Sequence, residues 1–155
     1  YDEQGEHQKA VDDWDQVLKV QEHPTYQLRR AVSLARGGNH IAATEVVEEL
    51  DILDQENARP SLLLNAACVY SRSVESVEAN DTLDDTQRKE TAERLLQQGT
   101  TFLERLFERD DPEHRPLAEQ VRQDRDLTRL RKFGPVQDLL DGTSDTAGEP
   151  PRAAS

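Results

Sequence analysis

The chain of 155 residues is predicted to be all-α, an α-solenoid of antiparallel helix pairs closed by a C-terminal capping helical segment. Apolar residues recur at spacings of three and four, and no stretch alternates with the period of two that is typical of a strand. A pattern of three residues also repeats: a small residue, a bulky residue four positions later and an apolar residue three positions after that. Its recurrence indicates repeated helix pairs. Its three copies are Ala10, Trp14 and Val17; then, 33 positions later, Ala43, Val47 and Leu50; and finally Gly99, Leu103 and Leu106.

Helix-stop residues divide the first part of the chain into three predicted helices. Gly5 is expected to form a turn, followed by an amphipathic helix that a His-Pro pair ends. Gly37 and Gly38 stop the second helix, because glycine readily adopts the left-handed conformation of a C-cap. Asn39 is a natural N-cap for the third helix. The second and third helices are expected over 25–36 and from 39 to about 53.

The second part of the chain contains longer predicted helices. Pro60 begins the first of them, since proline fits the first turn of a helix. After Asp141 the chain reads GTSDTAGEPPRAAS and has no core residues, so a flexible tail is predicted there. Helices are expected over 60–77, 84–109, 116–123 and from Gly134 onward, with a loop at 78–85, a break at 110–112 and a further turn capped by Asp124.

The repeat pattern resembles the tetratricopeptide repeat. Residues 1–11, YDEQGEHQKAV, look like that family's inter-helix turn and second helix, and Leu63, Ala66, Ala67 and Tyr70 match its first-helix pattern. Gln27 and Arg30 depart from the pattern, because they stand where apolar residues are usual. The resemblance divides the chain into a partial repeat at 1–23, a repeat at 24–58, a repeat with a long insertion at 60–110, a capping segment at 112–140 and the tail at 141–155.

A narrower resemblance involves LLLNAACVYS and the closing RQDRDLTRLRKFGPVQDLL. Together they are similar to the C-terminal tetratricopeptide region of large bacterial serine/threonine kinases. The residues that match the closing motif are Asp124, Asp126, Leu127, Leu130, Arg131 and Phe133. The resemblance implies that this segment caps the stack. The sequence itself has no glycine-rich loop, HRD or DFG motif, so a kinase domain would lie upstream of Tyr1.

Composition narrows the classes of partner. The net charge is −13, which makes nucleic acid and anionic membranes unfavourable partners. The single cysteine allows no internal disulfide, and no apolar run or signal-peptide pattern is present, so a cytoplasmic location is expected. The chain begins at Tyr1 and contains no methionine, so it is expected to be a fragment of a longer protein.

The expected function is non-catalytic protein–protein interaction, because stacked helix pairs form a groove lined by the first helix of each pair. No cofactor or metal is expected, since the four histidines lack ligand spacing. The oligomeric state is left open. The partner is expected to be a protein or peptide, held through its backbone or a carboxylate. The predicted peptide-binding residues are Leu28, Arg29, Val32, Arg36, Leu64, Asn65, Cys68 and Arg72.

Three alternatives stay open. In the first, Cys68 and Tyr70 line a pocket, and the chain is an enzymatic or ligand-binding helical domain. Cys68 is nevertheless expected to be a buried structural thiol. Residues 122–132 carry five basic and two acidic groups, so they form either a docking strip for an acidic partner or nucleic acid, or a solvated face that pairs with acidic residues. Asn65 either contacts a peptide or only bridges helices.

Overall fold

The computed structural model describes residues 3–20, 23–108 and 114–148, and every regular element in this part of the chain is helical. The elements are α1 (Glu3–Val20), α2 (Pro24–Arg36), α3 (His40–Glu49), the short 3₁₀ turn η1 (Ile52–Asp54), α4 (Pro60–Glu78), α5 (Asp85–Phe107), α6 (His114–Gln123), the 3₁₀ turn η2 (Arg125–Leu127), α7 (Thr128–Arg131) and α8 (Gly134–Gly148). The prediction of an all-helical chain is confirmed for these residues. None of the described helices is long and apolar enough to cross a membrane.

Local capping explains where several helices begin. The Asn39 side chain accepts a hydrogen bond from the Ala42 amide at the start of α3, as predicted. Asp84 and Gln87 form a reciprocal capping box at the start of α5. The turn after α2 ends at Gly38, whose φ of 96° favours glycine. These caps fix the boundaries that separate the helices of each pair.

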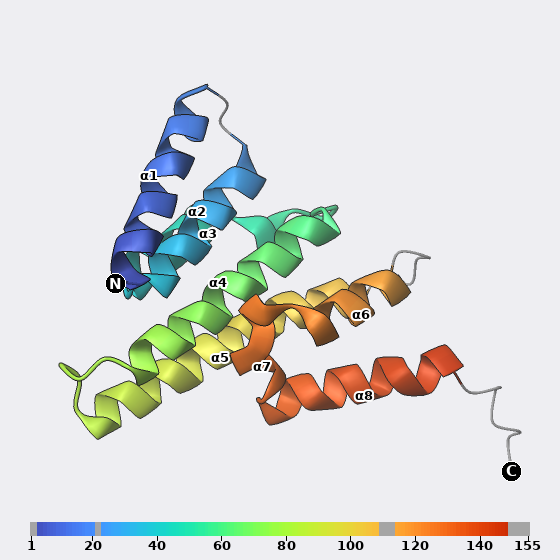
Figure 1. Cartoon of the computed structure of the whole chain (residues 1–155). Helices are drawn as coiled ribbons and strands as arrows, with labels where there is room; N and C mark the ends of the chain where they lie inside the picture. Colours follow the sequence, from blue (N-terminus) through green and yellow to red (C-terminus); the bar gives the residue numbers. More distant parts are fainter. Residues whose placement is uncertain (1–2, 21–22, 109–113, 149–155) are drawn as a thin grey trace, which may run out of the picture.

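The first three helices form the upper left part of the molecule in Figure 1. Trp14 of α1 stacks on Tyr26 of α2 with ring centroids 5.7 Å apart, and Arg30 of α2 pairs with Asp15 of α1. Gly5 lies inside α1, so the turn predicted there is wrong. A glycine costs an exposed helix only about 1 kcal/mol, so a long helix tolerates it.

The third helix ends earlier than predicted. It stops at Glu49 rather than near residue 53, and Asp51 then takes the left-handed conformation with a φ of 47°. This turn carries Ile52 into the core, where only 2% of its surface remains exposed. Burial of an isoleucine side chain outweighs the loss of one further helical turn.

Helix α4 is the centre of the fold. It packs against α2, α3, α5, η2 and α7, and Figure 1 shows it crossing the middle of the molecule beside the antiparallel α5. The consecutive residues Leu62, Leu63 and Leu64 are all buried, which requires neighbours around most of the helix. Most of the insertion predicted in this repeat lengthens α4 and α5 on both sides of a short turn, in agreement with the helices predicted over 60–77 and 84–109.

The C-terminal segment covers one side of α4 and α5. Asp124 accepts a hydrogen bond from the Asp126 amide and so caps η2, as predicted. Helix α8 continues to Gly148, so the flexible tail predicted from Asp141 is wrong for 141–148. Buried Val136 and Leu140 anchor its first turns, and adding turns to an existing helix is easier than starting one. The rest of the predicted tail and the predicted break at 110–112 lie outside the described residues.

Helices cross closely in the core at Gly99 of α5. A Cβ atom added there would lie 2.9 Å from the Tyr70 Cβ and 3.0 Å from the nearer methyl carbon of Leu130. Real side chains avoid such distances, so α4, α5 and α7 meet here because residue 99 has no side chain.

Gly99→Ala is therefore expected to lower the free energy of unfolding by about 1–3 kcal/mol, as overpacking of a core does. Gly142→Ala is the matched control, because Gly142 is also helical and nothing lies within 4 Å of the added Cβ. The control should stabilise the protein by about 0.5–1 kcal/mol through helix propensity. Urea unfolding of both variants measures the difference. Equal shifts in the same direction would show that the crossing at residue 99 is not tight.

Candidate functional site

The structure separates the eight predicted peptide-binding residues into two groups. Four of them belong to the hydrophobic core: Leu28, Val32, Leu64 and Cys68. A partner on the surface cannot contact them directly, so their prediction as groove-lining residues is corrected. Arg29 and Arg36 are exposed on α2, and Asn65 and Arg72 are partly exposed on α4.

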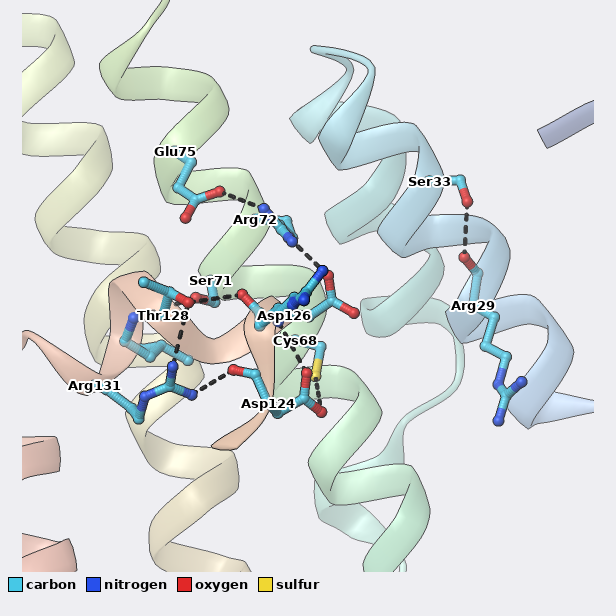
Figure 2. A network of polar contacts seen from close by, with 12 residues as sticks. Arg29, Ser33, Cys68, Ser71, Arg72, Glu75, Asp124, Asp126, Thr128 and Arg131 are labelled. Carbon is cyan, nitrogen blue, oxygen red and sulfur yellow. Dashed lines mark hydrogen bonds and ion pairs between the residues drawn. The ribbon is translucent and has the colours of Figure 1, made fainter. Parts of the chain in front are cut away.

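The predicted groove face of α4 is covered by the chain's own η2 and α7. Figure 2 shows this contact. The Arg72 Nε donates to Asp126 Oδ1 at 2.7 Å, and its Nη1 donates to Glu75 Oε2 at 2.9 Å. The Leu130 amide donates to the buried Ser71 Oγ at 3.1 Å. These residues form what we call the α4 clasp, which joins α4 to a segment more than fifty positions later in the sequence.

Electrostatics within the α4 clasp favour its ionised form. Burial alone would lower the pKa of Arg72, but the hydrogen bonds and charges of Asp126 and Glu75 outweigh it and raise that pKa. Arg129 extends the contact, because its guanidinium donates to both carboxylate oxygens of Glu78 at 2.7 and 3.1 Å. Hydrogen bonds to Glu78 raise the pKa of Arg129 as well. The clasp is thus held by fixed charges at neutral pH.

Three of the five basic residues at 122–132 have structural partners. Arg129 pairs with Glu78, and Arg122 pairs with Glu119 and donates to the Leu140 carbonyl. Arg131 donates to the carbonyls of Val121 and Asp124 and thereby joins the end of α6 to η2. These contacts favour a face that pairs with the protein's own acceptors over a docking strip.

Cys68 is enclosed rather than reactive. Its surface is 3% exposed, and its Sγ lies 3.8 Å from Asp124 Oδ2. Burial, followed by the negative charges of Asp124 and Asp126, raises the pKa of the thiol well above its ordinary value of 9.0. Since the thiolate is the nucleophile, burial and the raised pKa both disfavour a nucleophilic role for Cys68 at neutral pH. Burial likewise raises the pKa of neighbouring Tyr70 to about 12.

A cleft of about 610 Å³ opens beside the clasp, at the C-terminal ends of α2 and α4. Arg36 of α2 and His7 of α1 lie on one side, which we call the α2 side, and Arg72, Glu75 and Asp81 lie on the α4 side. Two predicted binding residues, Arg36 and Arg72, therefore meet at one cleft. Further lining residues are Ala35, Gly38, Ser76, Ala79 and Asn80.

Sequence reasoning identified Arg72 on the α4 side of this cleft but missed the lining residues beyond it, from Glu75 to Asp81. The cleft exists because α4 extends beyond the end of α2: it has 19 residues, whereas α2 has 13. The predicted helix lengths contained this signal, but the groove was placed at the middle of α4 instead. Within 3–20, 23–108 and 114–148, no group of three His, Cys, Asp or Glu side chains is arranged to hold a metal ion.

The α4 clasp can be tested by a double-mutant cycle of Arg72→Gln and Asp126→Asn. The two side chains are 20% and 32% exposed, so solvent screens their attraction only in part. We expect a coupling energy of about 1 kcal/mol, which is the upper range for partly exposed pairs. Urea unfolding of the four proteins measures it. A coupling energy near zero would show that the pair does not hold the C-terminal segment on α4.

The raised pKa of the Cys68 thiol predicts that the free energy of unfolding depends on pH in alkaline solution. Because its pKa is raised in the folded state, the stability that it contributes is complete below about pH 9 and is lost at higher pH, where only the unfolded chain ionises. The free-energy difference between the wild type and Cys68→Ala should therefore narrow above pH 9, by up to about 1.4 kcal/mol per pH unit. Urea unfolding from pH 7 to 10.5 of both proteins measures this. A constant difference would mean that the thiol ionises equally in both states.

Comparisons with known proteins leave the family undetermined. No protein-family model matches the chain, and neither a search of curated proteins nor a search of solved structures found a significant match.

Proposed function

We propose that the chain is a cytoplasmic, tetratricopeptide-like α-solenoid that acts as a non-catalytic protein–protein interaction module. We further propose that it is a regulatory or docking region of a larger multidomain protein, such as a bacterial serine/threonine kinase. The support comes from the helix packing and from the cleft.

The packing order supports a stack of helix pairs. Helix α2 packs against α1, α3 and α4, and α4 in turn packs against α3 and α5. Helices α2 and α4 run in the same direction in Figure 1, as the first helices of successive pairs would. Helix α7 and η2 occupy the next position against α4 and end the series. Such stacks present an extended surface along one side.

The single observation that carries the proposal is the cleft at the ends of α2 and α4. Its volume of about 610 Å³ is open to solvent, and it is lined by charged and polar side chains from α1, α2, α4 and the turn after α4. Peptide segments bind such grooves through side chains at fixed positions on rigid helices. The cleft therefore offers a site for a partner without a change in the fold.

The alternative of an enzymatic pocket at Cys68 and Tyr70 has weaker support. Both residues are 3% exposed and belong to the hydrophobic core. The Tyr70 ring stacks on Phe102 with ring centroids 5.6 Å apart, which is a core contact. A substrate at these side chains would have to displace packed helices.

A photo-crosslinking amino acid at position 76 tests the proposed function. Ser76 lines the cleft, whereas Thr101 is exposed on α5 and serves as the control position. In an extract of cells that express the parent protein, we expect a discrete crosslinked partner from position 76 and none from position 101. Mass spectrometry identifies the crosslinked protein. The same products from both positions, or none from position 76, would contradict a binding role for the cleft.

A further inference from the structure

Helix α2 carries an unusual charge for this protein. Its residues, PTYQLRRAVSLAR, include three arginines and no acidic side chain, although the whole chain has 32 acidic residues and a net charge of −13. Arg30 is neutralised by Asp15 of α1. The side chains of Arg29 and Arg36 are exposed and have no ion-pair or hydrogen-bond partner in the described part of the chain.

The two arginines lie on one face of α2. They are seven positions apart, which is nearly two helical turns, so their side chains leave the helix in almost the same direction about 10.5 Å apart along its axis. Ser33 lies between them, and its Oγ donates to the Arg29 carbonyl at 3.4 Å. Figure 2 shows the Arg29 guanidinium extending away from the α4 clasp, with no contact drawn to it. We call Arg29, Ser33 and Arg36 the α2 stripe.

The α2 stripe leads into the cleft, because Arg36 is one of its lining residues. The charged lining groups on the opposite side of the cleft are Arg72, Glu75 and Asp81, with a net charge of −1. Arg72 and Glu75 neutralise each other there, and Arg72 also pairs with Asp126. Asp81 is the acidic group on that side with no ion-pair partner among the described residues. The α2 side is therefore the positive side of the cleft, and the α4 side is not.

We propose that the α2 stripe docks an extended acidic peptide, whose carboxylates pair with Arg29 and Arg36 while its chain enters the cleft. In a polyproline II segment, side chains at positions n and n+3 point the same way about 9.3 Å apart, which is close to the rise of about 10.5 Å between the two arginine positions on α2. Guanidiniums bind carboxylates through paired, charge-assisted hydrogen bonds. This inference rests on the proposed function and names its partner as acidic and extended.

Selection from a random peptide library displayed on phage tests the inference. We expect enriched peptides to carry Asp or Glu at positions n and n+3. Synthetic peptides of the enriched sequence, with both acids retained or both replaced by Gln or Asn, are then measured by fluorescence anisotropy. The neutral peptide should bind at least about tenfold more weakly, because two charge-assisted contacts are lost. Binding of the acidic peptide should also weaken as salt is raised from about 0.05 to 0.5 M, since salt screens exposed charges.

Protein variants locate the site. Arg29→Gln and Arg36→Gln should each weaken binding of the acidic peptide about five- to tenfold, as the loss of a charged partner does. Arg30→Gln is the matched control on the same helix and should leave binding unchanged, because Arg30 is held by Asp15. Asp81→Asn should strengthen binding, since it removes the acid on the opposite side of the cleft.

The outcomes separate this inference from the proposed function. The library could instead enrich neutral or basic peptides that reduce crosslinking of the partner from position 76. That result would overturn the acidic-partner inference and keep the interaction role. Acidic peptides that bind equally to Arg29→Gln, Arg30→Gln and Arg36→Gln would also overturn it. Failure to enrich any peptide would overturn both. Circular dichroism shows that each variant is folded before it is measured.

Discussion

The close approach of α4 and α5 at Gly99 is the constraint on which the rest of the structure depends. Tyr70 of α4 and Leu130 of α7 both lie where a side chain at residue 99 would be. The pair of long helices is therefore joined directly to the C-terminal segment, rather than through an intervening layer. A packed interior transmits small displacements, so the position of α7 follows from the absence of a side chain at residue 99.

The α4 clasp then decides which surface of the stack is free. The Leu130 amide donates to Ser71, and the next residue of α4, Arg72, donates to Asp126. That face of α4 is where the sequence predicted a peptide-binding groove. The chain covers it with its own η2 and α7, so the exposed surface moves to α2 and to the end of α4 beyond the clasp.

The sequence predicted local features better than long-range ones. Asn39 and Asp84 sit at helix starts because their side chains cap nearby amides, and such contacts depend on neighbours within a few residues. The burial of Cys68 followed from its apolar neighbours. The cover over Arg72 could not be predicted in this way, because its partner Asp126 lies 54 residues away and nothing local specifies the pairing. Cys68, which contacts Asp124 of the same covering segment, was predicted to line an open groove for this reason.

The ion pairs of the arginines link the fold to the proposed function. Arg72, Arg129 and Arg30 each have an acidic partner, as expected in a chain with a large excess of carboxylates. Arg29 and Arg36 lack one among the described residues, although they lie on the same helix as Arg30. An exposed ion pair contributes under about 1 kcal/mol to stability, so folding alone gives little reason to pair them or to place both on one face. A carboxylate supplied by a partner gives such a reason, and the cleft beside Arg36 gives that partner room.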